Sequence, residues 1–156
     1  MLPNSAYLHI LINHVPVIGT GMVLFVLLYG MIRRSDEIKK LALILMILTA
    51  IVTIFVYTSG EKTGQIVEGI SGVNEDFISP HGEFADWSFK ASTVVGIVAL
   101  ALFIIYRKKH LPMGMVILFF VLVLGVNGMM AWTSHLGGKI NHLEIMGESP
   151  LLKPKQ

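Results

Sequence analysis

The sequence predicts an all-α integral membrane protein, built as a bundle of four membrane-spanning helices. Hydrophobic residues make up 54% of the 156 residues and charged residues 14%, and the mean hydropathy is +0.72. A soluble domain is closer to about 45–50% apolar. Four apolar segments also reach the roughly 20 residues that a helix needs to cross a bilayer. These observations predict a single domain over residues 1–156 that is surrounded by membrane lipid.

The four expected spans are joined by two short connections and one long one. The first span has no basic region or small-residue cleavage site ahead of it, so we expect it to be retained rather than removed as a signal peptide. The long connection, Gly60 to Pro80, holds a candidate interfacial helix at Gln65–Ile70. Ser79 followed by Pro80 is typical of a helix start and predicts that the third helix begins at His81. The expected spans are Ala6–Ile32, Leu41–Ser59, Trp87–Tyr106 and Pro112–Ser134.

Basic residues predict the orientation of the bundle. The two short loops, RRSDEIKK and RKKH, hold seven of the 12 Lys and Arg residues, whereas eight of the ten acidic residues lie on the other side. Lys and Arg beside membrane spans stay on the cytoplasmic side, so both termini are expected in the periplasm, with the chain crossing a bacterial inner membrane several times. The net charge of +2 is then a signal of topology, and no nucleic-acid partner is expected.

Histidines are the candidate ligands for a cofactor. The sequence contains no cysteine, which excludes disulfides, iron–sulfur clusters, thiolate-bound metals and covalently attached c-type haem. A cofactor would therefore be held by nitrogen, oxygen or methionine sulfur. Only His110 is expected on the cytoplasmic side. The other five histidines converge on the outer end of the bundle and are the candidate metal and cofactor ligands: His9, His14, His81, His135 and His142.

The spacing of these histidines favours haem b held by pairs of imidazoles. At about 100° per helical residue, His9 and His14 point about 140° apart, so they would face different neighbours, and two haems are expected. Gly21 lies seven residues from His14, and Gly128 lies seven residues from His135. Each glycine is on nearly the same helix face as its histidine, which leaves room for a flat macrocycle. A four-helix bundle with facing histidines is a common host for haem.

Two alternatives use the same histidines. A copper- or zinc-binding membrane protein is one, because Met129, Met130 and Met146 lie near the same end and thioethers with imidazoles suit copper. A structural membrane-anchor subunit without cofactor is the other, since a histidine in a membrane helix also serves as a hydrogen-bonding partner for a neighbouring helix. The glycines would then serve close helix packing.

The segment LHILINHVPVIG, residues 8–19, resembles the opening of a bacterial family of four-helix integral membrane domains of unknown function. In that family a leading histidine is followed five residues later by a second, in a Val-His-Phe-Pro-like motif. His9, His14 and Pro16 occupy these positions, with Val15 in place of the aromatic residue. The resemblance covers most of the chain and implies a histidine-bearing bundle, without an established reaction.

Three further segments are similar to the same family. TSG at residues 58–60 matches a Thr-Gly at the end of the second helix, His81 matches a histidine of the third helix, and GGKINH matches a closing Gly-Gly with a histidine beyond it. The departures are the missing proline directly after His9, the shortened spacing from Gly138 to His142, and the additional His135. They leave open which histidine of the fourth helix is a ligand.

The expected function follows from the position of these histidines. With no histidine cluster on the cytoplasmic side, the chain lacks an inner haem to carry electrons across the membrane. We therefore expect a b-type cytochrome subunit of a respiratory complex, a quinol-oxidising part of an oxidoreductase that transfers electrons between the quinone pool and a periplasmic carrier such as a c-type cytochrome. Candidate proton acceptors are Glu83, Asp86 and Glu61, and Trp87 and Trp132 are candidates to line a quinone ring or a haem edge. Tryptophans also belong to the interfacial belt, and acids near a helix start complement its dipole.

Overall fold

The structure is a computed structural model that describes residues 5–67 and 75–141. No strand occurs in these residues, and four of the helical stretches are long and apolar enough to cross a membrane. The all-α prediction with four membrane spans is therefore confirmed, and the chain is a multi-pass membrane protein. The helices are α1 Ser5–Ile12, α2 Val15–Ile32, α3 Asp36–Val67, α4 Ile78–Tyr106 and α5 Met113–Asn141, with a 3-10 turn, η1, at Glu75–Phe77.

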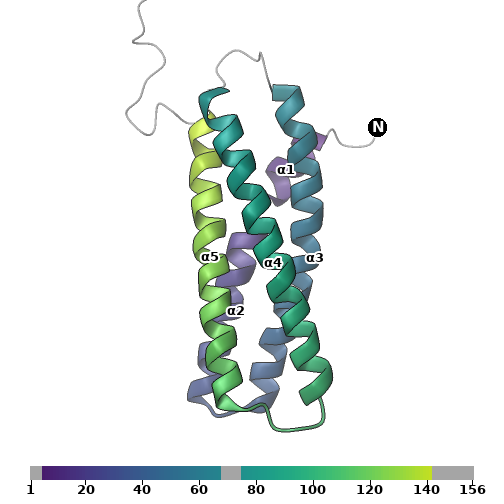
Figure 1. The fold of residues 1–156 in the computed structure, drawn as a ribbon, viewed down its shortest axis with the longest axis vertical. Helices are drawn as coiled ribbons and strands as arrows, with labels where there is room; N and C mark the ends of the chain where they lie inside the picture. Colours follow the sequence, from purple (N-terminus) through teal and green to yellow (C-terminus); the bar gives the residue numbers. More distant parts are fainter. Residues whose placement is uncertain (1–4, 68–74, 142–156) are drawn as a thin grey trace, which may run out of the picture.

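The helices α2 to α5 form an up-and-down bundle (Figure 1). Each of the four packs on two neighbours, in the cyclic order α2, α3, α4, α5, and the short α1 packs on α3. The connections 33–35 and 107–112 lie at the same end, drawn at the bottom of Figure 1, which we call the loop end. The opposite end carries α1 with His9 and the start of α4 with His81, and we call it the histidine end.

The bundle has an apolar interior and an equally apolar exterior. In the most apolar stretch of each span, only 28–33% of the residues are buried inside the bundle. Large apolar side chains such as Phe25 and Ile32 are 72% and 70% exposed. Exposing this apolar surface to water would be energetically unfavourable, whereas contact with lipid tails carries no such free-energy cost. The fully buried apolar side chains include Val23, Leu27, Leu43, Met46 and Val123.

Several polar side chains inside the bundle find partners within it, whereas the hydroxyl of the buried Ser92 has none among the described residues. The hydroxyls of Thr20, Thr49 and Thr53 each donate a hydrogen bond of 2.8 Å to the carbonyl one turn earlier in the same helix. The Asn127 amide nitrogen donates across the bundle to the Val17 carbonyl at 2.9 Å and to the Thr20 hydroxyl at 2.8 Å. In lipid an unpaired polar group has no water with which to form a hydrogen bond. The two hydrogen bonds of Asn127 therefore help to hold α5 against α2.

The first span is present, but it is not the continuous helix expected over Ala6–Ile32. Asn13 and His14 separate α1 from α2. Pro16 has no backbone N–H and leaves the carbonyl of Ile12 without its helical donor, which favours a break at this point. Hydropathy does not change across the break, so composition alone predicts one helix.

The other helices run beyond the expected spans, because hydropathy finds the apolar centre of a helix rather than its polar ends. The prediction that α4 begins at His81 is wrong by three residues. Its N-cap is Phe77 rather than Ser79, since η1 leads directly into the helix. Pro80 then falls in the first turn, where its missing N–H is no loss. The interfacial helix expected at Gln65–Ile70 is in its first three residues a continuation of α3, and its remainder lies outside the described residues.

Candidate cofactor site

His9 is fixed against α3 at the histidine end. Its Nδ1 atom lies 3.1 Å from the carbonyl oxygen of Val56 and 3.4 Å from the hydroxyl of Ser59. Because a carbonyl oxygen only accepts, the bond to Val56 requires that Nδ1 carries the hydrogen. The ring also lies directly over Gly60, where a Cβ atom would come within 2.7 Å of the imidazole Cε1. His9 thus fills a space that only a glycine on α3 leaves open.

His81 is fixed against α5 in the same way. Its Nδ1 lies 3.0 Å from the carbonyl oxygen of Thr133. A Cβ atom at Gly137 would lie 3.0 Å from the imidazole Cε1. The hydroxyl of Thr133 in turn bonds the hydroxyl of Ser88 at 2.8 Å and donates to the carbonyl of Met129 at 2.9 Å. This polar group of α4 and α5 holds the carbonyl that orients His81.

The two half-buried imidazoles form a pair with matching geometry. They come from α1 and α4, and both lie at the histidine end of the bundle. Both use Nδ1 for a backbone carbonyl, and among residues 5–67 and 75–141 neither Nε2 has a hydrogen-bond partner. An imidazole whose Nδ1–H is held by a carbonyl presents the lone pair of Nε2 in a fixed direction, which is the usual arrangement of a histidine metal ligand.

The remaining candidate histidines lie apart from this pair. His14 is exposed at the break between α1 and α2, and its side chain makes no capping bond to α2. His135 is also exposed, with its ring centroid 5.3 Å from that of Trp132. His142 lies outside the described residues. Of the four candidate ligands that the structure describes, His9 and His81 are therefore the two that are half-buried and held by a backbone carbonyl.

The glycines predicted to make room for a macrocycle lie elsewhere in the bundle. At Gly21 the nearest contact of an added Cβ is the amide nitrogen of Asn127, at 3.7 Å, and at Gly128 the space is open. The glycines that contact the imidazoles are instead Gly60 and Gly137. Both glycines belong to motifs in the sequence, TSG and GGKINH. These motifs are the signal that could have identified Gly60 and Gly137 as part of the site. Spacing along one helix missed them because each lies across from its histidine on a different helix.

The candidate acids differ in their surroundings. Asp86 accepts a hydrogen bond from the Tyr57 hydroxyl at 3.3 Å and forms an ion pair with Lys90 at 2.5 Å. Tyr57, which the sequence did not single out, also stacks on Phe89 with ring centroids 4.5 Å apart. Glu83 and Glu61 are exposed. Asp86 is thus the candidate with defined partners at the seam between α3 and α4.

Both candidate tryptophans lie on the outside of the bundle. Trp87 is 63% exposed, with the Lys90 ammonium 5.2 Å from its ring centroid. Trp132 is 50% exposed and lies between Phe84, at 6.3 Å, and His135. Their outward positions at the histidine end are those of an interfacial aromatic belt.

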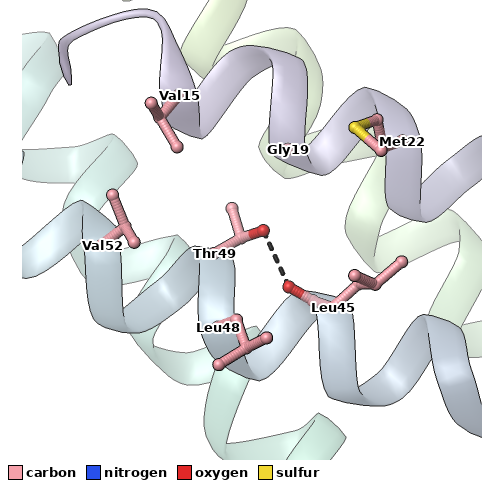
Figure 2. Close-up of a pocket in the computed structure, with 7 residues that line it drawn as sticks. All are labelled: Val15, Gly19, Met22, Leu45, Leu48, Thr49 and Val52. Carbon is pink, nitrogen blue, oxygen red and sulfur yellow. Dashed lines mark hydrogen bonds between the residues drawn. The ribbon is translucent and has the colours of Figure 1, made fainter. Parts of the chain in front are cut away.

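Neither His9 nor His81 lines the groove shown in Figure 2. The groove shown in Figure 2 has a volume of about 170 Å³ and opens between α2 and α3. Its one hydroxyl, that of Thr49, is already bonded to the carbonyl of Leu45 at 2.8 Å, so the groove offers only apolar contacts. Within residues 5–67 and 75–141, no three His, Asp or Glu side chains gather closely enough to hold a metal ion. The groove is lined by Val15, Gly19, Met22, Leu45, Leu48, Thr49 and Val52.

Comparison of the chain with models of protein families, with curated proteins and with solved structures finds no match.

Proposed function

We propose that this chain is a membrane-bound b-type cytochrome subunit that transfers electrons between the quinone pool and a periplasmic electron carrier, within a respiratory complex of the bacterial inner membrane. The observation that carries the proposal is the histidine pair. His9 and His81 come from different helices, each is oriented by a carbonyl on a neighbouring helix, and neither Nε2 has a hydrogen-bond partner in the part of the chain that the structure describes. A haem b held by two imidazoles would require two such atoms.

The chemistry of the donor set supports haem b over other cofactors. The chain has no cysteine, so neutral imidazoles are its strongest ligands. Once bound, haem b supplies a one-electron redox centre. The side chains of His9 and His81 would hold it, and the apolar bundle would exclude water from it. The described residues supply one matching pair. A second haem, expected from the sequence, would depend on His14 and His135, which lie on the outside of the bundle.

The seam between α3 and α4 supports a role for quinol. Oxidation of a quinol releases protons together with electrons, so an acceptor near the haem is required. The carboxylate of Asp86 is held by Tyr57 and Lys90 at the histidine end. Tyr57 directly follows Val56, whose carbonyl orients His9. A proton taken up by Asp86 would therefore lie beside the α3 segment that positions the histidine pair.

An optical spectrum of the purified protein tests this proposal. The dithionite-reduced minus oxidised spectrum of the wild type should show low-spin haem with two histidine ligands. His9→Ala and His81→Ala should each abolish that signal. His110→Ala is the matched control, because it removes a histidine at the loop end and should leave the spectrum unchanged.

The same preparation distinguishes the alternatives. A colourless protein that contains copper or zinc by elemental analysis would support a metal-binding membrane protein. A colourless protein without metal would support a structural anchor, because each Nδ1–carbonyl bond also ties two helices together. Loss of haem in His14→Ala and His135→Ala, with normal haem in His9→Ala and His81→Ala, would move the site to the outside of the bundle.

A further inference from the structure

At the loop end, Asp36 joins the two short loops into one unit. One carboxylate oxygen lies 2.7 Å from Nδ1 of His110 and accepts a bond of 3.1 Å from the backbone N–H of Leu111. The other oxygen pairs with the ammonium of Lys39 at 2.5 Å. Lys39 is only 1% exposed, so its ammonium has this carboxylate as a partner inside the bundle. The start of α3 and the loop before α5 are therefore held side by side.

Six basic residues of the two loops lie together at the loop end as a result. Lys40 reaches from α3 to the end of α4, where its ammonium lies 3.5 Å from the carbonyl oxygen of Arg107. Arg34 has a positive φ of 53° that closes the tight turn between α2 and α3, and its side chain is exposed. Because the carboxylate of Asp36 is already paired with Lys39, the exposed acid in these loops is Glu37. We call this surface the loop-end basic patch, and it consists of Arg33, Arg34, Lys40, Arg107, Lys108 and Lys109.

Apolar side chains border the patch directly. Ile32, which precedes Arg33, is 70% exposed, and Ile105, two residues before Arg107, is 56% exposed. Positive charge and lipid-facing apolar surface therefore meet at the end of the bundle. A ligand that satisfies both must carry a negative group joined to a long apolar part. A free phosphate ion offers the first without the second, whereas an anionic phospholipid offers both.

We propose that the loop-end basic patch binds anionic phospholipid, with the headgroup phosphate on the lysines and arginines and the acyl chains along the outer faces of α2 and α4. The site is independent of the histidine end, so it does not rest on the proposed haem. Each Lys or Arg near an anionic membrane surface contributes about 1 kcal/mol, or about fivefold in affinity. The charge arrangement also predicts that binding weakens as salt rises.

Native mass spectrometry of the full chain tests this site. The protein would be released from detergent that contains equal amounts of dioleoylphosphatidylglycerol and dioleoylphosphatidylcholine, and the bound lipids would be counted. The wild type should retain phosphatidylglycerol in preference to phosphatidylcholine. Each lysine is expected to contribute about fivefold to the affinity for phosphatidylglycerol. The double variant Lys108→Gln/Lys109→Gln should therefore lower this affinity by about 25-fold.

A second double variant controls for charge. Lys62→Gln/Lys139→Gln removes the same charge from the histidine end and should leave lipid retention unchanged. Thermal unfolding of both variants checks that they are folded. Equal retention by Lys108→Gln/Lys109→Gln and the wild type would overturn the proposal, as would an equal loss in the control variant, which would mean adventitious attraction to any cation. Displacement of the lipid by millimolar inorganic phosphate would identify a free-phosphate site instead.

Discussion

At the scale of single residues, the positions of the two half-buried histidines depend on glycines of neighbouring helices. His9 occupies the space above Gly60, and His81 the space above Gly137. Each ring is then within reach of one carbonyl, on Val56 or Thr133. A larger residue at either glycine would push the ring away from that carbonyl. The direction of Nε2 would change with it, so these glycines are positioning residues for any ligand of the pair.

Substitution at two adjacent positions of α5 tests this dependence. Gly137→Ala places a Cβ atom 3.0 Å from the His81 ring, whereas Gly138→Ala meets nothing within 4 Å. Both changes gain helix propensity, up to about 1 kcal/mol each. We therefore expect both variants to fold, with weaker haem binding in Gly137→Ala and normal binding in Gly138→Ala. Haem titration of the apoprotein, followed by its optical absorbance, measures the difference. Equal affinities for haem would show that Gly137 does not position His81.

At the scale of the elements, α3 and α4 approach each other closely at Ala50 and Gly96. A Cβ atom at Gly96 would lie 2.5 Å from the Cβ of Ala50, a separation that real Cβ atoms essentially never show. Each of these Cβ atoms is bonded directly to the backbone, so neither can move aside as the end of a flexible side chain could. The same seam carries Tyr57, Phe89 and Asp86 about two to three turns nearer the histidine end. Close packing at Gly96 therefore sets the distance between the helices that hold the candidate proton acceptor.

A reciprocal exchange tests the packing of α3 on α4. Gly96→Ala should destabilise the bundle by about 1–3 kcal/mol, the usual cost of overpacking a core. Ala50→Gly in the same chain removes the clashing methyl group and should restore much of that loss. Gly125→Ala, at a position with open space, serves as the control and should not destabilise. Unfolding in mixed micelles of increasing sodium dodecyl sulfate content measures all four proteins. If Gly96→Ala is as stable as the wild type, the two helices are not as close as described.

At the scale of the whole molecule, hydropathy predicted the four spans because a bilayer imposes one length and one polarity on each of them. The break at Asn13 and His14 was not predicted, since Pro16 changes hydrogen bonding and leaves the apolar character as it was. This affects the site. The angle estimated between His9 and His14 assumed one continuous helix, and with the break the two side chains no longer follow a common helical phase.

The composition of the candidate site was easier to predict than its geometry. Histidine was singled out because an ionisable side chain in a membrane helix needs a reason to be there. Which histidines pair depends on contacts between helices far apart in sequence, such as His9 with Val56 and His81 with Thr133. Residue type and spacing within one helix contain no information on those contacts. For the same reason Tyr57 was missed, because its partner Asp86 lies on the next helix.

The orientation of the whole bundle in the membrane is a final prediction. Both short loops lie at the loop end, with seven of the 12 Lys and Arg residues in or beside them. Because such residues are retained in the cytoplasm during insertion, the loop end should face the cytoplasm and the histidine end the periplasm. Alkaline phosphatase fused after Gln156 should then be active, and green fluorescent protein at the same position should be dark. A fusion truncated after Lys109 should give the opposite pattern.

A cytoplasmic C-terminus would contradict this orientation and would reverse what each end of the bundle can do. The histidine pair and Asp86 would then face the cytoplasm, and a periplasmic carrier would have no access to them. The loop-end basic patch would face the outer leaflet, although its chemistry would still suit an anionic headgroup. The proposed binding of anionic phospholipid would therefore remain compatible with a cytoplasmic C-terminus. The proposed electron transfer to a periplasmic carrier would not. The topology measurement thus tests the direction of the proposed electron transfer without depending on the haem itself.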